Sequence, residues 1–168
     1  MNQVLITAVI KETISNISTS GITIPMLIVE IAHKTTEKFY FDEIPVFLNV
    51  KNDSTHMYYK PGTIILINGN VCNINEKVGI VPKQIYMMSD KNYKQSSKQR
   101  IALCSGNNWI NQVSISGEID KKENSIITED IHLRGVVKPI NKIPVVNPIS
   151  SSVVSGQITK DGILEETK

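Results

Sequence analysis

The sequence predicts a mainly β protein, in which a small closed barrel of five strands with one short helix precedes a β-rich extension. Two observations support this fold class. Runs of β-branched and aromatic residues recur through residues 1–90, and turn residues bound each run. Beyond residue 110, shorter strand–turn–strand patterns continue to residue 168. Closing the first set into a barrel would leave no exposed sheet edge.

The first three barrel strands follow one another closely. The first is expected at QVLITAVI, residues 3–10, and the polar residues 11–21 separate it from the second, ITIPMLIVEIAH, residues 22–33. Pro25 lies near the start of that second strand, where a missing N–H is tolerated. The third strand, KFYFDEIPVFLNV, covers residues 38–50 and alternates around its aromatic residues.

The remaining barrel elements surround a Pro-Gly turn. The one candidate for a short helix lies within residues 49–60, where Asn-Asp-Ser can cap its start and Pro-Gly ends it. The fourth strand is expected at residues 63–74, and Gly69 in its middle indicates a bulge or a bend. The fifth strand is expected at residues 79–88. A five-stranded barrel often carries its helix between strands three and four, as expected here.

Residues 91–110 are polar and basic, so we expect a linker between the barrel of residues 1–90 and the extension of residues 111–168. The extension opens with NQVSISGEI, which is similar to NQVLITAVI near the start of the chain. The barrel takes about 90 residues, whereas 58 follow residue 110 and lack the Tyr-x-Lys-Pro-Gly turn. The extension is therefore not expected to form a complete second barrel. Its opening is either ordinary strand composition or the remnant of a duplication.

Charge is nearly balanced, with 18 Lys and Arg against 16 Asp and Glu and a net charge of +2. Residues 1–90 hold 7 Lys, no Arg and 8 acidic residues, whereas residues 91–168 hold 11 Lys and Arg and 8 acidic residues. This balance neither requires nor excludes a polyanionic partner. The densest basic segment is KNYKQSSKQR, residues 91–100, which has no acidic residue.

No pattern in the sequence indicates an enzyme, a metal or a cofactor. Phosphate-binding and nucleophile-elbow motifs are absent, and the adjacent carboxylates of Asp42 and Glu43 point to opposite faces of their strand. The three histidines, at positions 33, 56 and 132, are far apart in the sequence. We therefore expect a protein without catalytic activity, cofactor or metal.

The cysteines and the apolar segments favour a cytoplasmic protein. Cys72 and Cys104 have no metal-binding spacing and are expected as free thiols in a reducing compartment. The start of the chain has no signal-peptide pattern, and no apolar run approaches the roughly 18–20 residues that cross a membrane.

Three segments of residues 1–90, in order, resemble the bacterial and phage single-stranded DNA-binding protein family, whose fold is the OB-fold barrel. MNQVLITAVI is similar to its first strand, KFYFDEIPVFLNV to its third, and MYYKPGTIILINGNV to its turn and fourth strand. The match departs at Phe41, where the family usually has Trp. The resemblance implies sequence-tolerant binding of single-stranded DNA in replication or recombination, and assembly into a homo-oligomer.

Such binding combines aromatic stacking platforms with basic side chains that contact phosphates. The family match favours Phe41 as a stacking residue, with Tyr40 as the alternative if the register shifts by one. Phe47 shares the face of Phe41 unless Pro45 introduces a bulge. The expected phosphate contacts, with one further possible stacking residue, are Lys34, Lys38, Lys60, Lys91, Tyr93, Lys94, Lys98 and Arg100.

Two other functions remain open. The low net charge and the Pro-rich segment KPINKIPVVNPI, residues 138–149, fit a structural or assembly protein whose residues 111–168 contact protein partners. A weaker alternative is an enzyme subunit whose barrel holds substrate. Fold alone does not decide among these functions.

Overall fold

The structure is a computed structural model of the chain. It describes residues 1–19, 22–36, 38–48, 59–74, 77–88, 96–105, 108–120, 125–127, 132–134, 137–139 and 149–165. The helix expected within residues 49–60 falls almost wholly outside these ranges. No helix among the described residues is long and apolar enough to cross a membrane.

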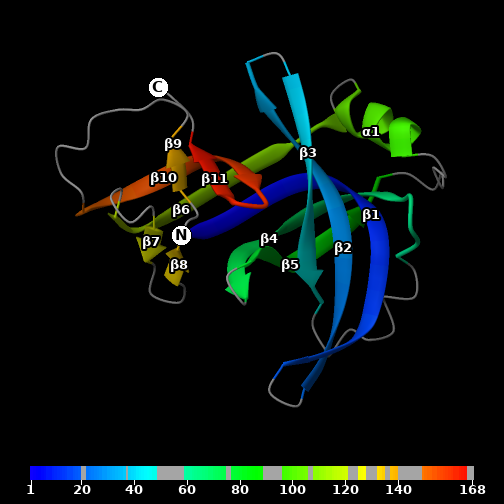
Figure 1. The fold of residues 1–168 in the computed structure, drawn as a ribbon, viewed down its shortest axis with the longest axis horizontal. Coiled ribbons are helices and arrows are strands. Elements are labelled where there is room, and N and C mark those ends of the chain that lie inside the picture. Colours follow the sequence, from blue (N-terminus) through cyan, green and yellow to red (C-terminus); the bar gives the residue numbers. More distant parts are fainter. Residues whose placement is uncertain are drawn as a thin grey trace.

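The first five strands close into a ring (Figure 1). They are β1 (Asn2–Thr19), β2 (Ile22–Thr35), β3 (Lys38–Phe47), β4 (Ile64–Ile74) and β5 (Lys77–Met87). Their order around the ring is β1-β2-β3-β5-β4, and β4 returns to β1. All neighbours are antiparallel except β3 and β5, which pair in parallel at Val46 and Ile80. The predicted five-stranded OB-fold barrel is confirmed.

Alternating aliphatic residues fill the barrel. Val4, Ile6, Ala8 and Ile10 of β1 point inward and are fully buried. Residues of the other strands complete the core: Leu27, Val29, Ile31, Ile44, Val46, Ile65, Ile67, Val71 and Ile80. This regular alternation of β-branched residues explains why the sequence pattern located the strands.

The first hairpin is longer than predicted. β1 continues through the polar segment to Thr19 and stays paired with β2 up to Thr19 opposite Ile22. The pairing is irregular between Ile10 and Glu12 and again between Ile14 and Ile17. The expected end of the strand at residue 10 was wrong, because β-branched Thr and Ile residues continue among the polar ones.

Gly69 marks the predicted irregularity of β4. The register of β4 and β5 shifts between Asn68 and Gly69. A Cβ at position 69 would lie 2.3 Å from the carbonyl oxygen of Val81 and 2.8 Å from the Cα of Pro82. Only glycine permits this close backbone approach.

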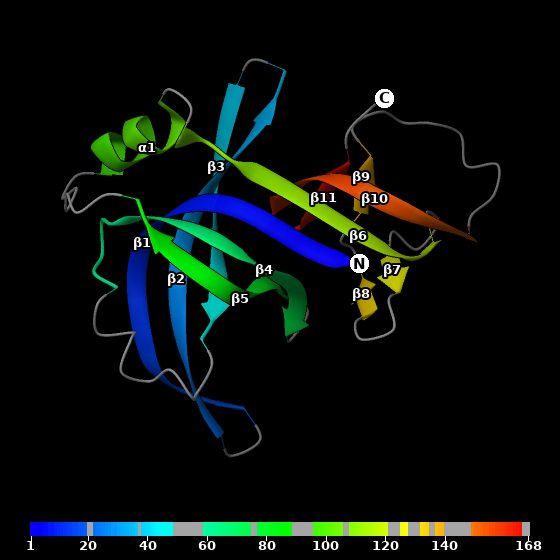
Figure 2. The same ribbon diagram turned by 180° about the vertical axis from the view of Figure 1, so that it is seen from behind.

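The extension continues the sheet of the barrel. Its strands are β6 (Asn111–Asp120), β7 (Ser125–Ile127), β8 (His132–Arg134), β9 (Val137–Pro139), β10 (Ile149–Thr159) and β11 (Gly162–Glu165). Because β6 pairs with β1, the 11 strands of the described residues belong to one sheet. Figure 2 shows β6 beside β1 from behind. A turn at Lys160 and Asp161 joins β10 to β11, and the predicted β-rich extension is confirmed.

The two Asn-Gln-Val stretches pair with each other. Their antiparallel register places Val4 opposite Val113, so Asn2 lies opposite Ile115 and Ile6 lies opposite Asn111. The pairing is therefore symmetric about its central valines.

The two asparagines make equivalent contacts on the neighbouring strands. The Asn2 side chain donates to the carbonyl oxygen of Val71 at 2.9 Å and accepts from its N–H at 2.8 Å. Asn111 does the same to Ile158 of β10, at 3.0 and 2.8 Å. These contacts and the central valines define a local two-fold relation between β1–β4 and β6–β10.

The pairings within the extension repeat the order of the first ring. β7 joins β6 to β8, and β11 lies between β10 and β9, with β9 and β11 parallel. Residues 135–136, between β8 and β9, lie outside the described ranges. The expectation that the extension does not form a complete second barrel therefore stays a prediction.

The segment expected as a linker contains a helix, α1 (Ser96–Cys104). Leu103 is fully buried with Val9, Ala32 and Ile64 on the outside of the barrel. This helix was not predicted, because its apolar residues are few and its long polar side chains are typical of a solvated loop.

We expect Gly69→Ala to lower the free energy of unfolding by about 1–3 kcal/mol, because the added methyl group collides with the backbone of β5. Urea denaturation measures this loss. Val81→Ala is the control, since that side chain is 41% exposed and its removal leaves the backbone contact intact. Equal midpoints for both variants would contradict the close approach.

Asn111→Ala should cost about 1–3 kcal/mol, because it leaves buried backbone groups of Ile158 and Ala32 without a side-chain partner. Gln112→Ala changes the exposed neighbouring residue of the same strand and should change stability by less than about 0.5 kcal/mol. The same urea midpoint for both variants would show that the Asn111 contacts contribute nothing.

Candidate nucleic-acid interface

The register of β3 decides which aromatic side chains share a face. β3 pairs with β2 without interruption from Lys38 to Phe47, so Pro45 introduces no bulge. Phe39, Phe41 and Phe47 therefore lie on one face of β3, and Tyr40 lies on the other face. The buried core residues of β3, at positions 44 and 46, share the face of Tyr40 further along the strand.

Phe41 lies on the outer face of the barrel, beside α1. Phe39, Phe41 and Trp109 pack against the buried cluster that contains Leu103 of the helix. The Arg100 guanidinium carbon lies 4.7 Å from the centre of the Phe41 ring. The predicted stacking residue is thus half-buried, with a cation over its ring.

Trp109 fixes the end of the segment that carries α1. Its ring meets Phe39 edge to face, with centroids 5.3 Å apart. Its indole Nε1 donates to the carbonyl oxygen of Ala32 at 2.9 Å. Trp109 was not among the predicted site residues, because its position outside the predicted barrel gave no sign of this contact.

A buried carboxylate lies beneath the helix. Glu30 of β2 is 4% exposed and accepts two hydrogen bonds from Arg100, at 3.1 and 3.2 Å. Lys11 approaches the same carboxylate at 3.8 Å and donates to Gln99 of α1 at 2.6 Å. The hydrogen bond to Glu30 raises the pKa of Arg100 further, so the guanidinium stays charged and its charge is compensated within the protein.

Tyr40 is open to solvent on the opposite face, near the turn that joins β2 to β3. Its side chain is 43% exposed and stacks on His33, with ring centroids 5.5 Å apart and planes 16° apart. Lys38 Nζ lies 5.4 Å from the centre of the Tyr40 ring. Lys34 Nζ lies 5.3 Å from the centre of the Phe39 ring, at the same end of the two strands. This end of the two strands therefore carries the exposed Tyr40 ring with Lys38 on one face, and Lys34 with Phe39 on the other face.

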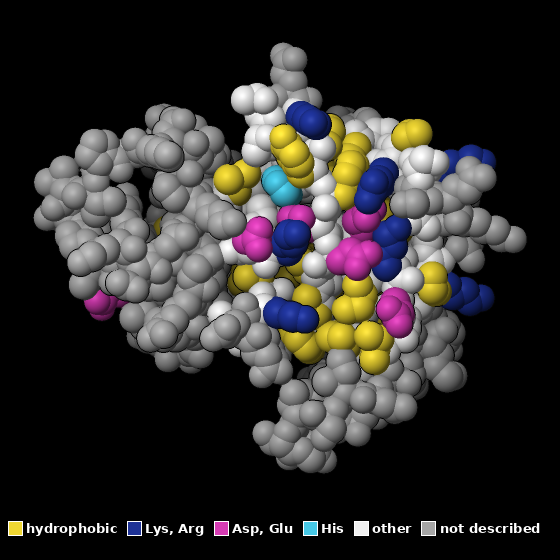
Figure 3. All heavy atoms as spheres, viewed as in Figure 1, with side chains coloured by type: hydrophobic (Ala, Val, Ile, Leu, Met, Phe, Trp, Pro, Cys, Tyr) yellow, Lys and Arg dark blue, Asp and Glu magenta, His cyan; other side chains and the backbone are white. Residues whose placement is uncertain are grey.

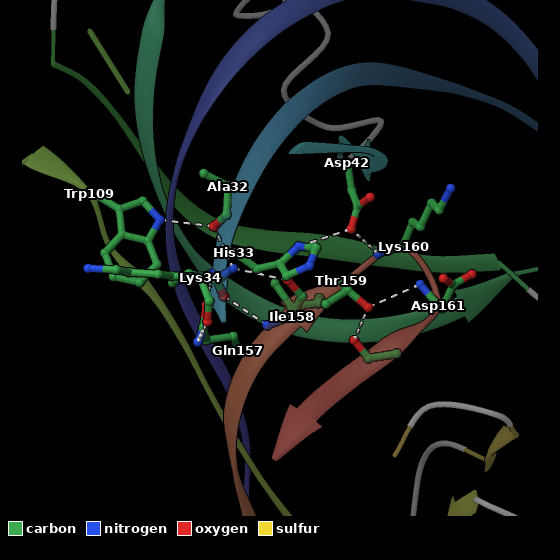
Figure 4. Close-up of polar contacts among 12 residues, drawn as sticks. Ala32, His33, Lys34, Asp42, Trp109, Gln157, Ile158, Thr159, Lys160 and Asp161 are labelled. Carbon is green, nitrogen blue, oxygen red and sulfur yellow. Dashed lines mark hydrogen bonds and ion pairs between the residues drawn. The ribbon is translucent and has the colours of Figure 1, made fainter. Parts of the chain in front are cut away.

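The extension holds this end of β2 in place, as Figure 4 shows. The Gln157 side chain accepts from the backbone N–H of Lys34 at 2.7 Å and donates to its carbonyl oxygen at 2.9 Å. The backbone N–H of Lys160 donates to Asp42, whose carboxylate also lies 3.2 Å from His33 Nδ1. β10 and the turn after it thus support the strands that carry the Tyr40–His33 stack.

The other predicted site residues are dispersed. Phe47 lies at the far end of β3, where its ring leaves no room for a Cβ at Gly79. Lys60 is exposed beside the turn that bonds to the backbone of Ile10, and Lys98 is exposed on α1. Three predicted residues lie outside the described ranges: Lys91, Tyr93 and Lys94. The structure brings Lys38 to Tyr40 on one face, and on the other face it brings Lys34 to Phe39 and Arg100 to Phe41.

The surface over β2 and β3 carries charges of both signs. Figure 3 shows Lys and Arg side chains interspersed with Asp, Glu and hydrophobic groups on this face. No continuous basic stripe crosses the described residues in this view. Phosphate contacts here would therefore come from individual lysines, and stacking would supply a large share of the affinity.

A second exposed aromatic residue lies on β5. Tyr86 is 49% exposed, and its hydroxyl donates to Gln84 at 2.6 Å. Lys83 on the same strand is exposed as well. Tyr86 lies within the predicted fifth strand, but the sequence did not show which face of that strand meets solvent.

The described residues contain no group of three or more His, Cys, Asp or Glu side chains that could hold a metal ion. Burial raises the pKa of the Cys72 thiol to about 11. Burial, with a smaller effect of Glu30, raises the pKa of the Cys104 thiol. Both thiols are therefore poor nucleophiles near neutral pH.

No family model and no curated protein matches the sequence. Two solved structures of the single-stranded DNA-binding protein from Thermus aquaticus are similar to the chain. A mutant with residues 228–252 deleted and the R190A substitution has a TM-score of 0.69 and 12% identity, covering 99% of this chain and 92% of that one. The wild-type protein has a TM-score of 0.58 and 12% identity, covering 100% and 94%. The chain therefore shares the fold of these proteins, and the likeness extends beyond the 90 residues whose sequence resembles the family.

Proposed function

We propose that this protein binds single-stranded DNA without sequence preference at the end of β2 and β3. Tyr40 is its stacking platform, Lys38 a phosphate contact on the same face, and Lys34 a second phosphate contact on the opposite face of the same end. The observation that carries the proposal is the exposed Tyr40 ring, which is stacked on His33 and lies beside Lys38. The fold supports it, since OB-fold barrels bind oligonucleotides over strands two and three. The similar Thermus aquaticus proteins are single-stranded DNA-binding proteins.

The Tyr40 ring suits stacking because its neighbours already fix it. His33 covers one side of the ring, and the Gln157 contacts hold the adjacent backbone of Lys34. A base that stacks on this ring would pack beside Lys38, whose Nζ lies 5.4 Å from the ring centre, and would order few other protein groups, which limits the entropy lost on binding. Base–aromatic stacking contributes roughly 1–3 kcal/mol per base and tolerates any sequence.

The lysines supply a modest electrostatic contribution. For single strands, the slope of log K against log salt is about −0.7 per neutralised phosphate, which gives about −1.4 for two lysines. This value is small, in keeping with the mixed charges of the surface over β2 and β3. This weak salt dependence distinguishes the proposed site from a strongly basic groove, whose binding constant would fall more steeply with salt.

The proposed activity involves no chemical step, cofactor or metal. We further propose that the protein acts in the cytoplasm during replication or recombination, and that it forms a homo-oligomer, as the family resemblance implies. The same proposal includes contacts of residues 111–168 with protein partners.

An assembly protein is the second candidate. The mixed charges of the surface and the helix over Phe41 favour it, because a surface devoted to nucleic acid is usually more basic. Such a protein would use its sheet and extension for protein contacts and would not bind oligonucleotides. The titration below separates the two candidates.

Fluorescence anisotropy of a labelled oligo-dT, titrated at about 50 and 200 mM salt, tests the proposal. We expect Tyr40→Ala to weaken binding about 5- to 100-fold, since it removes one stacking platform. Tyr86→Ala is the matched control, because it removes an equally exposed tyrosine from β5. Phe41→Ala should have a smaller effect than Tyr40→Ala, since Arg100 already occupies its ring.

Each result of this titration decides one point. No binding by the parent protein at about 50 mM salt would contradict the function and favour the assembly protein. Binding that Tyr40→Ala and Tyr86→Ala weaken equally would leave the function but remove Tyr40 as its site.

A further inference from the structure

We propose that α1 is an inhibitory cover over the outer face of β1–β3, and that single-stranded DNA displaces it. This inference concerns the regulation of the same barrel and rests on the proposed function. The covered face carries Phe39 and Phe41, so its opening would expose two aromatic side chains on the face of β3 opposite Tyr40.

The helix α1 lies on the outer face of β2 and β3. Register pairs Ala32 of β2 with Phe41, and Lys34 with Phe39, on the outer face of the barrel. Leu103 of α1 is buried against Ala32 in the cluster on which both phenylalanines pack. The helix therefore occupies the surface of strands two and three, where OB-fold barrels bind oligonucleotides.

The helix α1 is held on the barrel by few buried apolar contacts. α1 has nine residues, fewer than the roughly 12–15 that an isolated helix needs to be marginally stable. Of its described side chains, Leu103 is the fully buried apolar one, whereas Ile101 is 69% exposed. The main core of the barrel lies on the other side of the sheet and does not include Leu103. The helix can therefore leave without opening that core.

The polar contacts of α1 with the barrel include a guanidinium that could bind phosphate instead. Arg100 binds Glu30 through two hydrogen bonds and covers the Phe41 ring. The planar guanidinium binds phosphate in the same paired geometry as carboxylate. A phosphate chain on this face would therefore compete with Glu30 for Arg100. In the covered state, the same two groups neutralise each other and the face offers no free guanidinium.

With a cover of this kind, the apparent association constant equals that of the open face multiplied by the fraction of molecules in which the face is open. Loosening the helix should therefore tighten DNA binding, although it removes a native contact. A helix that forms part of the binding site would give the opposite result. The direction of the change in affinity thus distinguishes the two roles.

Leu103→Ala and Ile101→Ala form a matched pair for the test. Each shortens one apolar side chain of α1, but Leu103 is buried on the barrel and Ile101 is exposed. We expect Leu103→Ala to tighten oligo-dT binding by about tenfold, and Ile101→Ala to leave it within about twofold of the parent. Unchanged or weaker binding by Leu103→Ala, with the circular dichroism of the parent retained, would overturn the proposal.

Cys104 reports displacement of the helix without a packing change. It lies on α1, half-buried, and its raised thiol pKa predicts slow labelling by a maleimide in the free protein. In a Cys72→Ser background, saturating oligo-dT should accelerate Cys104 labelling at least about threefold. Unchanged or slower labelling at saturating oligo-dT would overturn the cover.

The two measurements separate the cover from the function on which it rests. Bound oligo-dT with unaccelerated Cys104 labelling would contradict the cover and leave DNA binding intact. No anisotropy change with the parent or with Leu103→Ala would contradict DNA binding, and with it the displacement of the helix by DNA.

Discussion

The pairing of β1 with β6 is the interaction on which the rest of the structure depends. It places Val4 opposite Val113 and joins the barrel and the extension in one sheet. The equivalent side-chain contacts of Asn2 and Asn111 fix the strands next to this pair, because each amide satisfies a backbone N–H and a carbonyl oxygen. The extension therefore continues the sheet of the barrel as well as its sequence.

The same pairing has a consequence for the candidate site. With β6 fixed on β1, β10 lies beside the end of β2, where Gln157 binds the backbone of Lys34. Strand alternation then places Tyr40 and Phe41 on opposite faces of β3. The extension supports the face of β3 that carries Tyr40 and leaves that ring exposed. The helix α1 covers the face that carries Phe41. One strand thus presents one aromatic residue in the free protein and keeps another beneath a helix.

The barrel could be predicted from the sequence because its signals are local. Alternating β-branched residues marked the strands, and Gly69 marked the irregularity of β4 at the residue where the register shifts. The continuation of β1 to Thr19 was missed, because its polar residues are stable in a strand through their pairing with β2. The similarity of the two Asn-Gln-Val stretches was visible, but local sequence does not show that two distant strands pair.

The candidate site was only partly predictable for the same reason. Tyr40 was named as the alternative to Phe41 if the register shifts by one, and Lys34 and Lys38 were named as expected phosphate contacts. The structure places all three at one end of β2 and β3. Arg100 was named for its charge alone. Its ion pair with Glu30 spans 70 positions, and no pattern near either residue indicates it. Residues such as Gln157, which act through backbone contacts, carry no local signal of their role.

Backbone hydrogen exchange with and without saturating oligo-dT follows β2, β3 and α1 in one measurement, because each backbone amide reports its own protection. When the oligonucleotide binds, we expect slower exchange around residues 33–41 and faster exchange in residues 96–104. Slower exchange in both segments would contradict the claim that DNA displaces α1. Protection confined to other strands would contradict the assignment of the interface to β2 and β3.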